Sequence, residues 1–203
     1  MNFKRYGSVV AALLALPVFI GINTNSAAGQ ELRWKTIMGI KESGDIVGVG
    51  TGKVSGGAPW ETLGGSVDVN LKTREVNFDV QGLILAIGAL FESGGTDFSP
   101  SPEASGLPIG TPAGLTAVKG TLVCNVTGDQ GPNSISVDTP VTTLDAQGNA
   151  HFLGNFTFSI PSQCFTNTAS DDAFLIRIVS GAFAGRWIAF GAVLFIKQEP
   201  HGE

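Results

Sequence analysis

The chain has 203 residues, with 12 Lys or Arg against 17 Asp or Glu and a formal net charge of −5 at pH 7. This length suits one domain with a sizeable core better than two domains. The acidic excess repels phosphate backbones and anionic lipids, which argues against nucleic-acid and membrane-surface binding.

Residues 1–28 have the pattern of a cleaved signal peptide. Lys4 and Arg5 precede an apolar run from Val9 to Ile22, and Ser26-Ala27-Ala28 offers small residues for a signal peptidase. The run of 14 residues is short of the roughly 20 that a membrane-spanning helix needs. We therefore expect a secreted or periplasmic mature chain with no membrane span. Loss of Lys4 and Arg5 would leave 10 basic against 17 acidic residues.

A strand is predicted at 45–55, where Gly48, Gly50 and Gly52 alternate along one face. A row of glycines lets another backbone or an aromatic ring approach closely, and Trp34 or Trp60 could supply the ring. A flat packing surface is the simpler explanation of the same pattern.

A hairpin is predicted from two segments of alternating polarity, 66–72 and 75–81, joined by a short polar turn. Alternation with a period of two places apolar residues on one face of a half-buried strand. The residues expected to face the core are Val67, Val69, Leu71, Val76, Phe78 and Val80.

Residues 88–114 are rich in Gly, Ser and Pro and break any regular pattern. A connection of this length in a compact domain is either a functional loop or a disordered insertion. Apolar residues such as Phe91 and Phe98 are available to hold parts of it in place. We expect a partly ordered loop at one end of the domain, and a frayed tail at 198–203.

The two cysteines are predicted to form one disulfide. Cys124 shares the apolar side of a predicted strand with Val118, Leu122 and Val126, and Cys164 is the only other cysteine. In an exported chain, an even number of cysteines indicates a structural disulfide. A metal site lacks ligands, because the chain has two His and no Cys-x-x-Cys motif, so no metal or other cofactor is expected. A reactive thiol is the remaining alternative.

Three further strands complete the predicted fold. Phe174, Ile176 and Ile178 alternate on one face, and 187–196 is apolar on both faces, as a covered central strand would be. The fold class is therefore all-β, an antiparallel two-sheet sandwich of the immunoglobulin-like kind with about eight or nine strands, as a single domain over 30–197. A closed barrel is the alternative. The third of these strands carries the remaining inward-facing residues, which are Ala150, Phe152, Phe156, Phe158 and Ile160.

No catalytic constellation is recognisable in the sequence. It lacks the Gly-x-Ser-x-Gly and His-Glu-x-x-His motifs, and the glycines at 48–52 do not have Walker A spacing. His151 falls on the polar side of its strand, which indicates a solvated residue.

Asp171 and Asp172 could join a calcium site, but a capped turn explains them more simply. The acidic residues that could pair for glycoside hydrolysis fall on outward positions or in turns; they are Glu61, Asp68, Asp79, Glu92, Asp138, Asp171 and Asp172.

Trp60 is the tryptophan expected to be exposed, because it follows the loop-like stretch Gly56-Gly57-Ala58-Pro59. An exposed indole can stack on a ligand ring and so indicates a carbohydrate-binding surface. The candidate ligand-binding residues are therefore Trp60 together with Phe91 and Phe98 of the long loop. No catalytic residue is assigned.

Three segments carry a family resemblance: 64–71 (GGSVDVNL), 76–83 (VNFDVQGL) and 174–186. They resemble chordin-type (CHRD) domains, which are secreted β-sandwich modules without a known catalytic activity. The His-x-His segment of that family is absent where 118–124 (VKGTLVC) stands, so none of its functional residues transfers. The chain is also similar to uncharacterised secreted bacterial proteins that carry the segments TLVC and GRWIA.

The sequence thus predicts an exported, disulfide-linked, non-enzymatic β-sandwich protein that serves as a binding or structural module. Its partner would be a carbohydrate or another envelope or extracellular protein. The alternative is an extracytoplasmic glycan-acting hydrolase with paired carboxylates. A hydrolase should show a cleft with two carboxylates about 5–10 Å apart, whereas a binding module should show an exposed aromatic or apolar patch.

Overall fold

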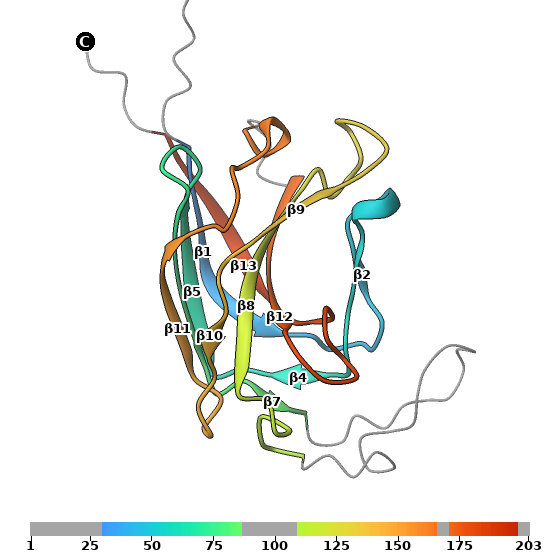
Figure 1. Cartoon of the computed structure of the whole chain (residues 1–203), viewed down its shortest axis with the longest axis vertical. Helices are drawn as coiled ribbons and strands as arrows, with labels where there is room; N and C mark the ends of the chain where they lie inside the picture. The colour runs from blue at the N-terminus through green and yellow to red at the C-terminus, as the bar shows by residue number, and fades with distance from the viewer. Residues whose placement is uncertain (1–29, 87–108, 166–170, 199–203) are drawn as a thin grey trace, which may run out of the picture.

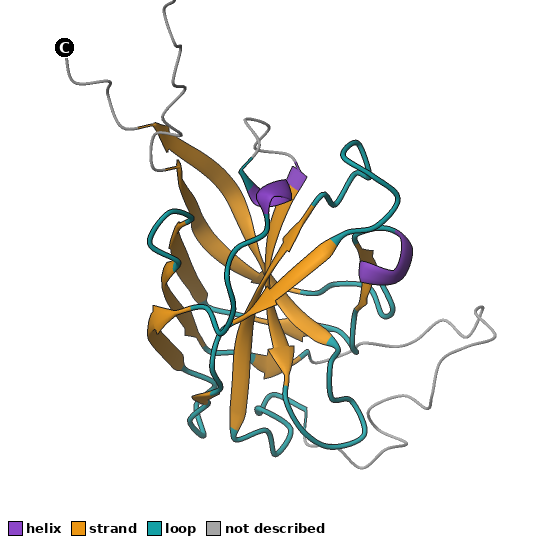
Figure 2. Ribbon diagram, turned by 45° about the horizontal axis from the view of Figure 1, so that its top comes forward, coloured by secondary structure: helices purple, strands orange, loops and turns teal. Residues whose placement is uncertain are grey.

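The computed structural model describes residues 30–86, 109–165 and 171–198, and its regular structure is almost entirely β (Figure 1 and Figure 2). Within these ranges there is no α-helix, only two 3₁₀ turns. The prediction of an all-β fold is confirmed. The longer strands are β1 (Gln30–Gly39), β5 (Gly64–Asn70), β6 (Glu75–Gln81), β8 (Ala117–Cys124), β9 (Ile135–Asp138), β11 (Ala150–Asn155), β12 (Asp172–Ile178) and β13 (Trp187–Gln198).

Short elements make up the rest of the regular structure in the described residues. Two small pairs lie beside the main sheet, β2 with β3 and β4 with β7. The short elements are β2 (Ile46–Val47), η1 (Gly50–Gly52), β3 (Val54–Ser55), β4 (Trp60–Glu61), β7 (Ile84–Leu85), β10 (Thr142–Thr143) and η2 (Ser162–Cys164).

Nine strands form one antiparallel sheet in the order β10-β8-β12-β13-β1-β5-β6-β11, with β9 also pairing with β8. The antiparallel class is confirmed, whereas the two-sheet sandwich is not. The reason lies in β13, which has 12 residues. It pairs with β12 on one edge and with β1 on the other, and so joins strands that a sandwich would divide between layers. Its central place agrees with the prediction for 187–196.

The sheet is curled, so that its two ends approach each other (Figure 1). At one point Thr142 Oγ1 donates a hydrogen bond of 2.8 Å to the carbonyl oxygen of His151, which joins β10 to β11. Close by, the backbone N–H of Thr157 donates to the carbonyl oxygen of Asp138 at 2.9 Å. The result is a half-barrel with one inner and one outer face.

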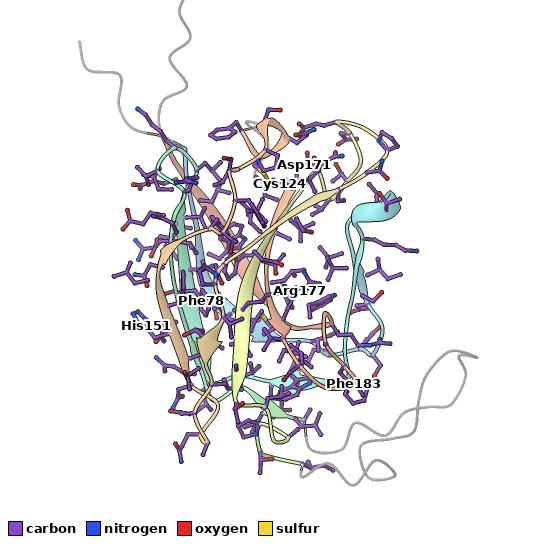
Figure 3. All side chains as sticks on the ribbon, viewed as in Figure 1. Phe78, Cys124, His151, Asp171, Arg177 and Phe183 are labelled. Atoms are coloured by element: carbon purple, nitrogen blue, oxygen red, sulfur yellow. A yellow bond between two sulfur atoms is a disulfide. The ribbon has the colours of Figure 1, made fainter. Side chains whose placement is uncertain are left out.

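Aromatic rings fill the inside of the curl. Phe78 of β6 and Trp34 of β1 both contact Phe174 of β12, with ring centroids 5.7 and 5.9 Å apart. Figure 3 shows Phe78 inside the curl and His151 on its outer side. Gly120 of β8 leaves room for this packing, because a Cβ there would lie 2.5 Å from the Phe174 ring. Two rings from distant strands thus meet over a position with no side chain.

The predicted hairpin is present as β5 and β6, with Gly64 opposite Gln81 and Asn70 opposite Glu75. All six residues predicted to face the core are buried. The first strand ends two residues earlier than predicted, because Asn70 Oδ1 accepts hydrogen bonds from the backbone N–H groups of Lys72 and Thr73 and so starts the turn.

The predicted disulfide is confirmed. Cys124 and Cys164 are joined, with their Cα atoms 5.1 Å apart, and both are fully buried. The covalent loop of 40 residues contains β9, β10 and β11. The bond therefore ties the strands that close the curl to the end of β8.

Two local predictions are wrong. The segment 45–55 is not one strand but the pair β2 and β3 joined by η1. Its glycines do allow a close approach, but of the backbone at Ser134, since a Cβ on Gly52 would lie 1.6 Å from the Ser134 carbonyl oxygen. Phe158, predicted to face inward, is 71% exposed because β11 ends at Asn155.

Several predictions concern residues outside the described ranges. The signal peptide at 1–28 lies there, as do Phe91, Phe98 and Glu92. Within the described ranges, no helix has the length and apolar character needed to cross a membrane.

Candidate functional site

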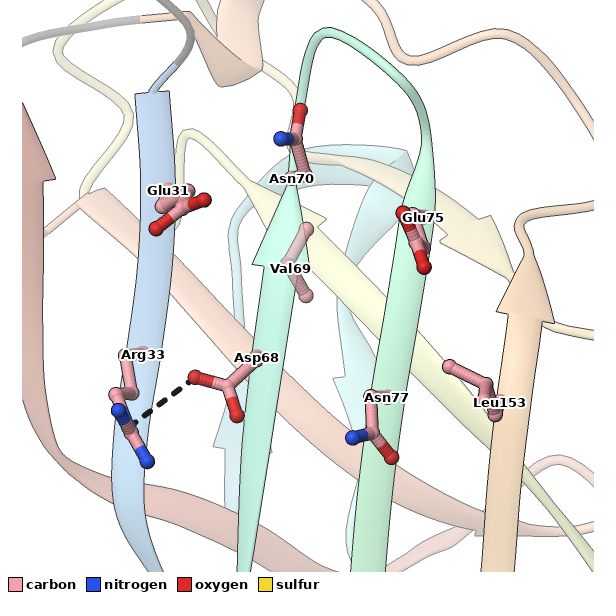
Figure 4. A pocket seen from close by; sticks show the side chains of 8 residues that line it. All are labelled: Glu31, Arg33, Asp68, Val69, Asn70, Glu75, Asn77 and Leu153. Atoms are coloured by element: carbon pink, nitrogen blue, oxygen red, sulfur yellow. Dashed lines mark ion pairs between the residues drawn. The ribbon is translucent and has the colours of Figure 1, made fainter. Parts of the chain in front are cut away.

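A groove of about 350 Å³ lies on the outer face of the sheet, over β1, β5, β6 and β11 (Figure 4). Strand pairing places its lining side chains in two rows that run across the strands. The first row is Arg33, Asp68, Asn77 and Leu153; the second is Glu31, Asn70 and Glu75.

The rows exist because apolar and polar residues alternate along these strands. Val67, Val69, Val76 and Phe78 point into the core and are at most 1% exposed. The residues between them therefore point outward. Because β5 pairs with β1 and β6, and β6 pairs with β11, outward side chains from four strands lie side by side: polar ones from β1, β5 and β6, and Leu153 from β11.

The first row contains an ion pair, an amide and an apolar group. Arg33 Nε lies 3.1 Å from Asp68 Oδ1, and both side chains are about half exposed. Asn77 stands opposite Asp68 on β6, and Leu153 stands opposite Asn77 on β11. Leu153 is 63% exposed, so the row ends in an accessible apolar side chain.

The second row contains two carboxylates on either side of an amide. Asn70 stands opposite Glu31 on one side and Glu75 on the other. The Oδ1 atom of Asn70 is engaged by the turn, so the amide N–H₂ group is the part of this side chain that can donate to a ligand. Acceptors and donors therefore alternate along this row.

The groove carries more negative than positive charge. Its lining has three carboxylates, from Glu31, Asp68 and Glu75, and one guanidinium, from Arg33. An anionic ligand would meet repulsion here, whereas a neutral or cationic ligand would not. Within the described ranges, no group of three or more His, Cys, Asp or Glu residues is arranged to hold a metal ion.

The prediction that Trp60 is exposed is wrong. Its side chain is 3% exposed and belongs to the core. β4 is held by a hydrogen bond of 2.8 Å from the Trp60 N–H to the Ile40 carbonyl oxygen and pairs with Leu85 of β7. The Gly and Pro residues at 56–59 lie in the segment that crosses the end of the sheet, and the indole of Trp60 fills the core at that end. Trp60 is therefore not placed to stack on a ligand.

Asp171 and Asp172 are buried, whereas the sequence pattern predicts outward positions or a turn capped by acidic side chains. Asp171 organises the loop that follows β8: its Oδ1 accepts hydrogen bonds from the N–H and the hydroxyl of Thr127, and its Oδ2 accepts one from Gln130. These contacts occupy the carboxylate with protein donors, which supports a structural role in place of the calcium site considered above.

Asp172 lies on the inner face, next to the disulfide. Its Oδ1 atom is buried without a hydrogen-bond partner. Desolvation by burial, with a smaller contribution from the nearby Asp171 charge, raises the pKa of Asp172 to about 7. Asp172 is on the opposite side of the sheet from the groove, so it is not available to a ligand bound there.

The other predicted acidic residues are dispersed. Asp138 is paired with Lys119 and Arg177 on the outer face of β8 and β12. Asp79 accepts a hydrogen bond of 2.8 Å from Gln81, and Glu61 is exposed on β4. Among the predicted residues that the structure describes, Asp68 is the one that lies in the groove. His151 is exposed on β11, as predicted for a solvated strand residue.

Most of the groove was missed because its signal is spread over four strands. Arg33, Asn77 and Leu153 carry no motif, and each is an ordinary outward residue in its own strand. The sequence predicts which residues of 66–81 point outward, but it does not predict which strands lie on either side of this hairpin.

Comparison of the chain with protein families, with curated proteins and with solved structures gave no match.

Proposed function

We propose that this chain is an exported, non-enzymatic binding module and that the groove over β1, β5, β6 and β11 is its ligand site. The observation that carries the proposal is the groove itself. Its volume of about 350 Å³ falls within the roughly 300–1,000 Å³ of small-molecule sites. Its lining offers donors, acceptors and one exposed apolar side chain within a single surface.

Export is part of the proposal and has two supports. One is the signal-like pattern of residues 1–28. The other is the Cys124–Cys164 disulfide, since such bonds persist in oxidising compartments such as the periplasm and the extracellular space. Kinship with secreted β-sandwich proteins of the chordin type is proposed on the strand pattern of three segments, 64–71, 76–83 and 174–186.

The proposal is tested by an NMR screen of the ¹⁵N-labelled protein against sugars, peptides, polyamines, nucleotides and organic acids. We expect at least one class to shift amide signals clustered on the four groove strands, and Asn77→Ala to weaken that shift. Gln147→Ala, which removes an exposed amide from a distant turn, is the matched control. If no class perturbs these strands, the binding proposal fails and a purely structural role is favoured.

One observation favours a glycan hydrolase as the second candidate. The groove holds three carboxylates, and Glu31 and Glu75 are separated by one strand, which places their backbones about 10 Å apart. Inverting enzymes hold their two carboxyl groups roughly 6.5–9.5 Å apart, and side chains on backbones at this spacing can reach such a distance. Release of shorter products from an oligosaccharide, abolished by Glu75→Gln, would support hydrolysis over binding alone.

A further inference from the structure

We propose that the groove binds a neutral, linear oligosaccharide that lies across the four strands. This inference rests on the proposed function of the groove and specifies its ligand class. The argument uses the shape of the groove, the chemistry of its two rows and its charge.

The shape follows from strand pairing. The first row crosses from β1 over β5 and β6 to β11, and the second crosses from β1 over β5 to β6. Since neighbouring strands lie about 4.8 Å apart, the four strands span about 14 Å. The two rows are separated by two residues along each strand, which is about 7 Å. The groove is therefore about twice as long as it is wide, with its long axis perpendicular to the strands. An extended chain of sugar rings has this form.

The chemistry of the rows suits hydroxyl groups. The amides of Asn70 and Asn77 can donate, and the carboxylates of Asp68 and Glu75 can accept. A hydroxyl group both donates and accepts, so a polyhydroxylated ligand can bond to every member of such a row. The exposed side chain of Leu153 at the end of the first row offers an apolar contact for the C–H face of a sugar ring.

A peptide fits this surface less well. Extended peptides bind sheets by pairing with a free strand edge, where backbone groups satisfy one another. Here β5 and β6 are paired on both edges, and only side chains face the groove. A peptide lying across the strands would leave its regularly spaced backbone groups poorly matched to them.

The charge of the groove selects a neutral chain over an acidic one. Even with Arg33 paired to Asp68, the carboxylates of Asp68 and Glu75 line the groove. A uronic-acid or sulfated oligosaccharide would bring anions beside them. The same argument disfavours phosphate-bearing ligands.

The test is an array of neutral and acidic linear oligosaccharides of one to six units, probed with the full mature protein. The strongest neutral binder is then compared with its shorter homologues by calorimetric titration. We expect affinity to rise with length until the chain fills the groove and then to level off. Asn77→Ala should weaken binding about tenfold, the effect of losing one hydrogen-bonding side chain, and Gln147→Ala should leave it unchanged.

The inference is overturned by any of three results: no neutral oligosaccharide binds, acidic chains bind more tightly, or a monosaccharide binds as tightly as the longer chains. Equal binding by Asn77→Ala and wild type would overturn it as well. If the groove strands respond to another ligand class in the NMR screen, the ligand assignment fails while the binding function stands. If they respond to nothing, both fail.

Discussion

Asp172 lies directly opposite Cys124 in the pairing of β12 with β8. Residues opposite each other in a pair point to the same face, so the buried carboxyl and the disulfide are neighbours on the inner face of the sheet. The half-barrel therefore contains an ionisable group at the point where its covalent bond closes the loop that holds β9, β10 and β11. Folding stability should depend on both features.

The first prediction concerns pH. The pKa of Asp172 is raised from 3.8 to about 7 in the folded chain, so the folded state retains a proton that the unfolded state releases between these values. The stability from Asp172 is fully present below about pH 4 and is lost as pH rises to about 7, with a slope of up to about 1.4 kcal/mol per pH unit.

Urea denaturation of wild type and Asp172→Asn between pH 4.5 and 7.5 checks this prediction. As pH rises from 4.5 to 7.5, we expect the free energy of unfolding of the wild type to fall relative to that of Asp172→Asn. Glu61→Gln, which changes an exposed carboxylate on β4, is the control and should track the wild type. A constant difference between wild type and Asp172→Asn would contradict the prediction.

The second prediction concerns the disulfide. Because the closed loop has 40 residues, removing the bond with Cys124→Ala and Cys164→Ala together should lower the free energy of unfolding by about 4 kcal/mol on the chain-entropy model. Denaturation curves with and without a thiol reductant provide the measurement. The reductant should destabilise the wild type and leave the double variant unaffected; an unchanged wild-type midpoint would count against a stabilising bond.

The third prediction concerns Gly120. A methyl group at this position would meet the Phe174 and Phe78 rings at 2.5 and 3.0 Å, so Gly120→Ala should cost roughly 1–3 kcal/mol through overpacking. Adding Phe174→Leu to Gly120→Ala should recover part of this loss. The test is a double-mutant cycle of the free energies of unfolding. Strictly additive effects would mean that the two positions do not compete for the same space.

The sequence allowed good predictions where a single strand carries its own information. Alternation at 66–81 identified the hairpin and its six buried residues, and Cys124 was correctly assigned to an inward position. The continuity of the sheet could not be predicted, because pairing of β13 with both β12 and β1 depends on contacts between distant segments. A run that is apolar on both faces indicates burial but does not identify its neighbours.

The candidate site was harder to predict for the same reason. Its rows combine one or two outward residues from each of four strands, and β1 and β11 are more than 100 residues apart in the chain. Trp60 was misassigned because Gly and Pro residues before it indicate a loop, while burial of its indole depends on the elements that surround it. The Gly and Pro residues thus correctly predict an irregular backbone before Trp60, but they do not predict that its side chain is buried.

The fourth prediction separates stability from binding by comparing Trp60 with Asp68. Because the indole of Trp60 is 3% exposed, Trp60→Ala should lower the free energy of unfolding by roughly 3–5 kcal/mol, while the less drastic Trp60→Phe should keep the fold and the groove ligand affinity. Asp68→Asn breaks an exposed ion pair, which should change stability by less than about 1 kcal/mol but weaken ligand binding. Denaturation and calorimetric titration of the same samples measure both quantities. Loss of affinity in Trp60→Phe together with unaltered affinity in Asp68→Asn would move the ligand site away from the groove.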